Sequence, residues 1–473
     1  MSLKQLFLQC LITFSEKTRK NREASKIMKH SSRILPFAYF LLSLAHSPQI
    51  FAQIDIQIDI AALTSPEAAV AGALTTLCSN LQASDTNLTP DQQQLLDVCN
   101  RLGAASLSEK ENAYRAMSAR SATTETTLML YGPMSQPVVI VDNRLSALRK
   151  AAKNATNAGL EFQLNNQPLY ANLQNATGGG ASADVQSAGR LSGFVSGMYT
   201  DSKQDETLTL AGFNGKTYGL LLGADYRFTD TFFAGLAARY STTNADINRN
   251  AGSLDAKDIN LTQYGTFYPR PQWYLDWTLE LGQGQFDLER NIDFSLGGTT
   301  FNETAKGNTD GNHYGASAGG GYELVTPTGI VSQLYGNFRY FKADIDQYTE
   351  SSGHGLNLRV DGQSIESVVG KLGAQISKAL SYSWGVLAPQ ANLNYLYEFN
   401  TDGQSIKASF VSDPLNTQFA FTTEPRDESY FTFAAGVVAL FPGGFTAYLQ
   451  YENYFELKNY SQSVWSLGAR MEF

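Results

Sequence analysis

Few residues in this 473-residue sequence are of the types that carry chemistry, and their spacing argues against a catalytic site. The sequence holds neither an H-E-x-x-H zinc motif nor a phosphate-binding P-loop. After the first fifty residues only two histidines occur, His313 and His354, in or beside predicted polar loops. A hydrolase would need serine and aspartate partners for them, held rigidly on strands. We therefore expect no enzymatic activity, no catalytic or metal-binding residues and no cofactor, with a barrel-embedded hydrolase as the least favoured alternative.

Cysteine chemistry is the second possibility. Cys10 lies in a basic segment that processing would remove, which leaves Cys78 and Cys99. No histidine or third cysteine lies near them, so a metal site is disfavoured. In an exported chain we expect a disulfide between Cys78 and Cys99.

Export is indicated by the only long apolar stretch, near the start of the sequence. Met28 to Arg33 is basic, Ile34 to Leu44 is apolar, and Ile50-Phe51-Ala52 precedes Gln53 as a cleavage site. These features predict a signal peptide within residues 1–52, read by the inner-membrane export machinery. Met1 to Ile27 is explained either by a start at Met28 or by an extended signal peptide. The mature chain is expected to begin near residue 53.

The cysteines require helices to position them, and residues 54–120 are predicted to be helical. Ser65-Pro66-Glu67 and Thr89-Pro90-Asp91-Gln92 are helix-start signals. Cys78 and Cys99 fall on the apolar faces of two short helices, which predicts a stapled hairpin. A third helix is predicted over Ser106 to Ser118, and Thr123 to Pro137 is predicted to be irregular.

Residues 138–189 are predicted to be a linker, since Asn154 to Gly189 is rich in Asn, Gln, Gly and Ala. Val138 to Lys153 has helical periodicity and a short strand is predicted at Leu160 to Leu164. Residues 53–137 thus form a small helical region, which the linker separates from the C-terminal part of the chain.

From Arg190 to Phe473 the apolar residues alternate with polar ones. Trp273, Leu275 and Trp277, for example, alternate with polar or small residues, and this period of two predicts strands. We predict about twelve strands, near 190–199, 216–228, 231–245, 256–268, 272–287, 312–324, 329–345, 364–379, 384–399, 429–441, 444–455 and 462–473. Tight connections alternate with long polar loops, predicted at 246–255, 288–311, 346–363 and 400–428.

Composition suits a membrane barrel, while a soluble all-β protein stays open on composition alone. Only 17% of residues are charged, there are 40 Gly, 24 Tyr and 27 Phe, and mean hydropathy is −0.23. Strands of about ten residues with aromatics near their ends suit a transmembrane barrel, with short periplasmic turns and longer external loops. The fold expected is mainly β, an antiparallel transmembrane β-barrel preceded by a small disulfide-linked helical region. The net charge of −9 gives no sign of nucleic-acid binding.

Residues 190–473 resemble the autotransporter β-domain in length, strand number and order. The resemblance rests on Leu387 to Ala391 followed by Glu398-Phe399, on Phe445 to Glu452, and on the terminal Leu467 to Phe473. It implies an outer-membrane protein of a Gram-negative cell that is recognised by the barrel-assembly machinery. The alternating terminal residues would form the assembly signal: Trp465, Leu467, Ala469, Met471 and Phe473.

The same resemblance implies that the barrel anchors, and helps to export, the segment before it through type V secretion. A helix passes through the lumen in that family, and Val138 to Lys153 is the candidate here, with a surface helix as the alternative. Asn165-Asn166 resembles the paired asparagines at which some members cleave themselves, although a plain linker is favoured. The segment 53–137 is far shorter than the usual passenger, so a passive channel remains an alternative function. A monomer is expected, in contact with outer-membrane lipid, and its N-terminal region would be periplasmic or on the cell surface.

Overall fold

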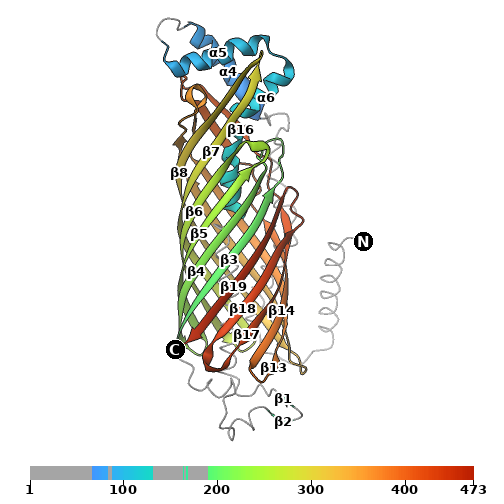
Figure 1. Cartoon of the computed structure of the whole chain (residues 1–473). Coiled ribbons are helices and arrows are strands. Elements are labelled where there is room, and N and C mark those ends of the chain that lie inside the picture. The colour runs from blue at the N-terminus through green and yellow to red at the C-terminus, as the bar shows by residue number, and fades with distance from the viewer. Residues whose placement is uncertain (1–65, 84–87, 132–162, 165–166, 169–189) are drawn as a thin grey trace, which may run out of the picture. The chain divides into compact units, whose positions relative to one another are not determined.

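A computed structural model describes residues 66–83, 88–131, 163–164, 167–168 and 190–473 (Figure 1). The predicted signal peptide, the candidate helix 138–153 and the pair Asn165-Asn166 lie outside the described residues. The described helices and the barrel belong to one compact unit. Among the residues described, no helix is both long and apolar enough to cross a membrane.

The helices before the barrel begin where local signals favour them. They are α4 (Pro66–Ala83), α5 (Pro90–Ala104), α6 (Leu107–Met117), η2 (Ala119–Ser121) and α7 (Ala122–Tyr131). Thr89 and Ser106 each form a reciprocal capping box, with Gln92 and Glu109 respectively, which satisfies orphan backbone donors at the start of α5 and α6. The three predicted helices are thus confirmed.

Residues 122–131 correct the sequence-based prediction, because this stretch is helical rather than irregular. Four threonines give α7 weak helix propensity, since β-branched side chains lose rotamer freedom in a helix. Nearly all of its described side chains are buried. Tertiary packing therefore stabilises α7, which is why periodicity gave no signal.

The barrel consists of twelve long antiparallel strands within residues 190–473, as predicted. Each pairs with the next long strand along the chain, including β12 with β14, and one further pairing, β19 with β3, closes the ring. Closure gives every strand two neighbours, so no backbone edge faces lipid. The strands are β3 (Leu191–Gln204), β4 (Phe213–Thr229), β5 (Phe232–Ile247), β6 (Gly252–Arg270), β7 (Trp273–Leu296), β8 (Thr299–Val325), β9 (Ile330–Ile345), β12 (Gln363–Lys378), β14 (Gly385–Glu398), β17 (Ser429–Leu440), β18 (Thr446–Phe455) and β19 (Tyr460–Glu472).

Shorter elements connect these strands. Four of them form a separate sheet in the order β10, β11, β15, β16, within the segments that were predicted as long loops. The shorter elements are β1 (Gln163–Leu164), β2 (Gln167–Pro168), η5 (Asn248–Asn250), β10 (Tyr348–Thr349), η6 (His354–Leu356), β11 (Leu358–Val360), β13 (Leu380–Tyr382), β15 (Ser405–Phe410), β16 (Gln418–Thr422) and η7 (Pro442–Gly444).

The lipid-facing surface is the alternating apolar face seen in the sequence. On β7, Leu275, Leu279 and Leu281 are exposed, while the residues between them face inward or lie half-buried. Beyond Leu281 the outward positions become polar, beginning with Gln283 and Gln285. The stretch 273–281 thus has the nine or so residues that a tilted strand needs to cross a bilayer.

Two predicted loops are in fact strand. Residues 288–311 continue β7 and β8 as one tall hairpin that turns at Gly297 and Gly298, both at positive φ. Residues 246–255 form a similar, shorter hairpin around η5. Their outward faces are polar, so the apolar alternation that identifies membrane strands is absent there. About fifteen residues of β7 project past the lipid band, or about 50 Å along the strand.

Candidate functional site

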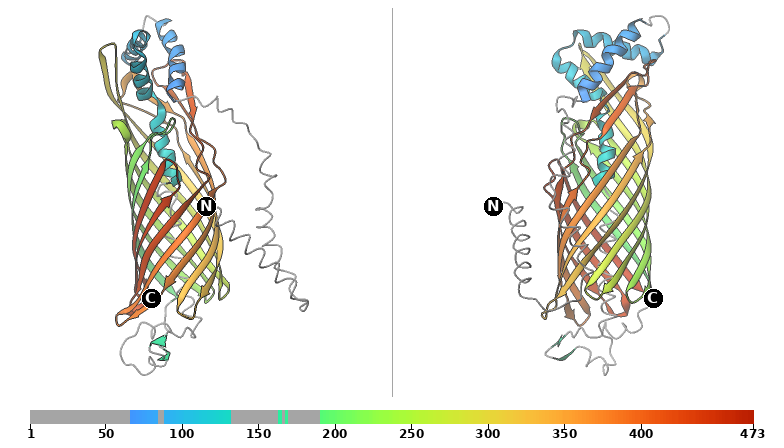
Figure 2. Two further views of the ribbon diagram at one scale, coloured as in Figure 1. Left: turned by 90° about the vertical axis from the view of Figure 1, so that its right-hand side faces the viewer. Right: turned by 180° about the vertical axis from the view of Figure 1, so that it is seen from behind.

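The site of interest is the end of the barrel where β7 and β8 project. The opposite end carries the tight turns, the start of β3 at Leu191 and the C-terminal Phe473 (Figure 1). Short turns mark the periplasmic end of outer-membrane barrels, so the projecting end is the outer one. The helices α4 to α6 lie at this outer end, and α7 runs into the barrel from it (Figure 2). We call residues 66–131 the cap.

The cap and the barrel wall share one apolar core. Its buried members include Leu77 and Leu95 from the cap helices, together with Phe286 and Phe341 from the strands. Leu128 and Met129 of α7 belong to the same cluster. Apolar side chains lining the inside of the outer barrel would be exposed to water without the cap, so burial of this surface favours docking.

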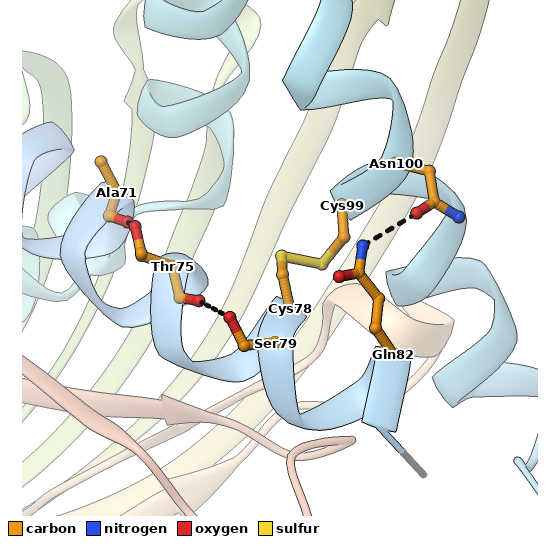
Figure 3. The surroundings of a disulfide bond; sticks show 7 residues. All are labelled: Ala71, Thr75, Cys78, Ser79, Gln82, Cys99 and Asn100. Atoms are coloured by element: carbon orange, nitrogen blue, oxygen red, sulfur yellow. Dashed lines mark hydrogen bonds between the residues drawn. A yellow bond between two sulfur atoms is a disulfide. The ribbon is translucent and has the colours of Figure 1, made fainter. Parts of the chain in front are cut away.

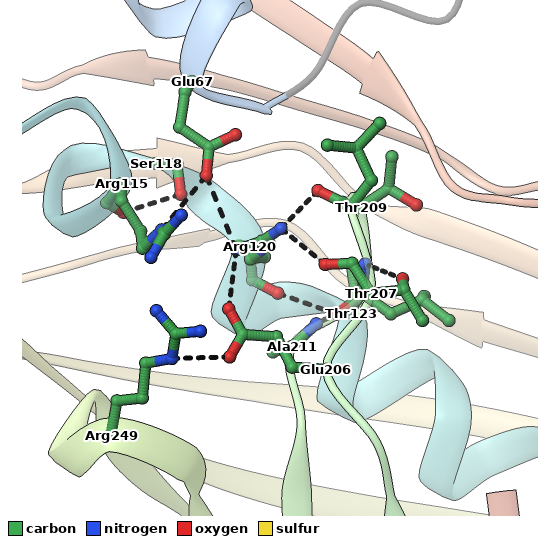
Figure 4. Close-up of polar contacts among 12 residues, drawn as sticks. Glu67, Arg115, Ser118, Arg120, Thr123, Glu206, Thr207, Thr209, Ala211 and Arg249 are labelled. Atoms are coloured by element: carbon green, nitrogen blue, oxygen red, sulfur yellow. Dashed lines mark hydrogen bonds and ion pairs between the residues drawn. The ribbon is translucent and has the colours of Figure 1, made fainter. Parts of the chain in front are cut away.

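Arg120, between α6 and α7, forms the most extensive polar contact between cap and barrel (Figure 4). Its guanidinium lies 3.5 Å from Glu67 and 3.1 Å from Glu206 and donates to the carbonyl oxygens of Thr207 and Leu208. Glu206, Thr207 and Leu208 lie between β3 and β4 on the barrel rim. Planar guanidinium donors suit such a set of acceptors, and Arg120 is buried.

Arg290 on β7 forms a second polar contact from the barrel side. Its Nε donates to Glu350 at 2.9 Å, and its other nitrogens donate to the carbonyls of Ala116 at 2.8 Å and Leu356 at 2.9 Å. Ala116 lies in the last turn of α6. Arg290 thus joins the end of a cap helix to the projecting hairpin and to the outer loops.

Smaller contacts follow the rim. Gln94 of α5 donates to Glu303 of β8 at 3.1 Å and accepts from the amide of Gly355 at 2.9 Å. The amide of Gly297, at the tip of the tall hairpin, donates to Glu109 of α6 at 3.2 Å. The cap is therefore held at several separate points around the mouth.

The predicted disulfide is present and joins α4 to α5 (Figure 3). The Cα atoms of Cys78 and Cys99 lie 5.5 Å apart, a normal separation for a bridge. Gln82 donates to Asn100 at 3.2 Å beside it. The bridge fixes two short helices that would be marginal alone.

Glycines on the inner face of β7 and β8 make room for α7. A Cβ added at Gly311 would lie 3.0 Å from the Met129 methyl, and one at Gly284 would lie 3.5 Å from it. At the tip of the helix, the ring of Tyr131 stacks on Tyr460 of β19, with centroids 5.1 Å apart. The helix thus contacts opposite sides of the barrel wall, as expected of a helix that fills the lumen.

Just beneath α7 the lumen is charged. His313 lies there, well inside β8, and the polar loop predicted beside it is itself strand. Its Nε2 is 2.7 Å from Asp258, which also accepts from Arg239 at 2.8 Å, and all three side chains are buried. Arg339 pairs with Glu280 at 2.6 Å. Arg239 and Arg339 thus form ion pairs on the inner face of the barrel.

Ser317 lies in a hydrolase-like pattern, since Gly315 to Gly319 matches G-x-S-x-G. In hydrolases that pattern forms a sharp turn between a strand and a helix. Here it lies inside β8, and the Ser317 hydroxyl hydrogen-bonds Thr278 at 2.7 Å. His313 lies four residues away, about 13 Å along the strand. The two side chains therefore do not form a nucleophile and base.

The remaining residues singled out in the sequence lie on the outer surface or on the lipid face. His354 lies in η6 on the outer surface, 3.7 Å from Glu303 and 4.0 Å from Asp91 of the cap. Among the described residues no cluster of three or more His, Cys, Asp and Glu side chains is arranged to hold a metal ion. Trp465, Leu467 and Met471 face outward from β19, and Phe473 is 70% exposed.

Comparison with known proteins agrees with this architecture. A sequence profile described as "Autotransporter beta-domain" matches residues 193–452. The chain is 29% identical over 252 residues to "Esterase EstA" of Pseudomonas aeruginosa, covering 51% of this chain and 37% of that protein. It is 23% identical over 240 residues to "Outer membrane protein B" of Rickettsia typhi, covering 46% of this chain and 14% of that protein. The chain thus spans little more than a third of the length of the first of these relatives and a smaller share of the second.

Among solved structures, the "Translocator domain of autotransporter NalP from Neisseria meningitidis" aligns with a TM-score of 0.48 at 17% identity. That alignment covers 62% of this chain and 96% of the other. Since the profile match spans more than half of the sequence, the chain belongs to the autotransporter beta-domain family, and its barrel lies in a Gram-negative outer membrane.

Proposed function

We propose that the barrel exports its own short N-terminal segment and retains it on the cell surface as a cap that closes the outer mouth. The observation that carries the proposal is the position of α7, which enters the barrel from the outer end and contacts its wall through Met129 and Tyr131. The chain resumes at Arg190 at the opposite end, beside the C-terminus. The described chain thus has Tyr131 inside the barrel and Arg190 at its periplasmic end.

The test is to locate the cap on cells. An epitope inserted at Asp85, between α4 and α5, should react with antibody on intact cells as strongly as after the outer membrane is permeabilised. A matched insertion in the tight turn at Asp230 and Thr231 should react only after permeabilisation. Labelling at Asp85 that required permeabilisation would contradict surface display.

We also propose that the protein is not an enzyme, although one relative is named an esterase. Support comes from the separation of Ser317 from His313 and from their engagement with Thr278 and Asp258. If the purified protein releases p-nitrophenol from an ester at a background rate, the Ser317→Ala variant should release it at the same rate. A tenfold or greater loss of a genuine activity on this substitution would refute the proposal.

The outward alternating residues of β19 are proposed as the signal read by the barrel-assembly machinery: Trp465, Leu467, Ala469, Met471 and Phe473. The aromatic ring of Phe473 is the most exposed of these, yet its backbone amide donates to Leu191 at 3.0 Å. Phe473→Ser keeps that backbone bond, so reduced outer-membrane levels would reflect recognition rather than lost pairing. Unchanged levels would argue against the signal.

Entry into the periplasm is proposed to use the inner-membrane export machinery, and the barrel is proposed to act as a monomer.

A further inference from the structure

One carboxyl group of the cap is buried where no opposite charge among the described residues compensates it. Glu125 lies on α7 and its side chain is completely buried. Its neighbours Tyr348 and Glu350 follow β9 at the outer end, beyond the lipid band. Burying an ionised carboxyl without a partner is costly, so such a group tends to hold its proton.

The cation beside this pair is already engaged. Arg290 donates to both carboxyl oxygens of Glu350, one of which also accepts from the amide of Leu358 at 2.8 Å. The side chains that β12 directs inward beside α7 are Gln363, Ile365 and Ser367, and none of them titrates. Within the described residues, the groups that act on Glu125 are therefore a phenol and a carboxylate that is itself paired.

Docking of α7 thus requires a neutral Glu125. Burial raises the pKa of Glu125 from its ordinary 4.5 to about 8; the Tyr348 phenol offsets part of this, and the Glu350 charge adds to it. When α7 leaves the lumen, the carboxyl returns to water and to its ordinary pKa. A group whose pKa is raised in the docked state favours docking fully below its free pKa and loses that contribution as pH rises through the docked pKa.

We propose that Glu125 makes closure of the barrel depend on pH, with the capped form favoured in acid and the open form in alkali. The inference rests on the proposed closure of the outer mouth by the cap. Between pH 4.5 and about 8 the ratio of docked to undocked α7 should fall about tenfold for each pH unit. Above about pH 8, titration of Glu125 should no longer change the ratio of docked to undocked α7.

The experiment is a pH series of single-channel recordings on the purified full-length protein in planar bilayers. The unchanged protein should be mostly closed near the acid end and open for a growing fraction of time toward alkali. Glu125→Gln keeps the shape of the side chain but cannot ionise, so it should stay closed and lose the pH dependence. Glu111→Gln removes an exposed carboxyl of α6 and should behave like the unchanged protein.

Glu125→Asp keeps a titrating carboxyl and should still open as the pH rises. Opening of this variant would show that a substitution at this position does not by itself prevent opening, so the closed state of Glu125→Gln would not be due to a folding defect. If Glu125→Gln opened with pH in the same way as the unchanged protein, the switch would be refuted while closure itself would stand. Steady current at every pH in the unchanged protein would instead refute closure by the cap.

Discussion

At the scale of single residues, Arg120 should be the most sensitive position for docking of the cap. Arg120→Gln leaves the carboxyl groups of Glu67 and Glu206 without this buried partner, which should weaken docking by about 3 kcal/mol. The measurement is the fraction of time that single barrels are open at fixed pH, which should rise sharply.

Arg115→Gln is the matched control for Arg120. Arg115 contacts the same Glu67 at 3.4 Å, but its side chain is 42% exposed. An exposed pair of this kind contributes about 0.5 kcal/mol, so opening should change little. Equal effects of the two substitutions would show that the rim carbonyls and Glu206 do not matter.

Asp258 should matter to the barrel rather than to the cap. Asp258→Asn would leave Arg239 buried in the lumen without its counter-charge, which should destabilise the barrel by about 3 kcal/mol. Asp255 lies on the same strand but is exposed, so Asp255→Asn should have almost no effect. Urea midpoints of the purified barrels in detergent would compare the two, and a stable Asp258→Asn barrel would contradict the role of the pair.

At the scale of elements, the disulfide should set the stability of the helical hairpin. Replacing Cys78 and Cys99 together by serine removes the constraint on a loop of about twenty residues, worth about 3 kcal/mol in the entropic model. The cap of this variant should be cut by added protease on intact cells much faster than the unchanged cap. Equal cutting rates would mean that docking on the barrel, rather than the bridge, keeps α4 and α5 folded.

The sequence predicted those helices and strands that have one face in contact with lipid or a core and the other face in contact with neither. The stretch Trp273 to Leu281 alternates for that reason, and the same logic identified all twelve barrel strands. The part of β7 beyond residue 287 escaped prediction because its outward positions, such as Glu289 and Asp293, are polar. Helix α7 escaped because Thr123 to Thr127 have no helical periodicity of their own and depend on the barrel around them.

The candidate site could be predicted only in part, for a related reason. The disulfide followed from a single cysteine pair in an exported chain. The contacts of Arg120 with Glu206 and of Arg290 with Ala116 join residues 86 and 174 positions apart along the chain, and no local pattern reports such a pairing. His313 was predicted to lie beside a loop, at the start of a strand, because residues 299–311 of β8 were not recognised as strand.

At the scale of the whole molecule, the barrel should persist without its cap. Every long strand has two neighbours, so deletion of residues 66–131 removes no strand pairing. The shortened protein should reach the outer membrane and conduct ions, since α7 no longer fills the lumen. A shortened barrel that remained closed would show that the polar layer around Asp258 and Glu280 blocks ions by itself. It would then argue against the passive-channel alternative as well.

The disulfide also constrains the order of events on the way out. If the cap reaches the surface through its own barrel, the lumen that now holds α7 admits an object about 10 Å wide. The loop closed by the Cys78–Cys99 disulfide can pass through the lumen as two extended segments side by side, since neighbouring strands are spaced about 4.8 Å apart. Two packed helices would need about twice the available width. The disulfide can thus form in the periplasm, but α4 and α5 must fold into helices only after they have left the barrel.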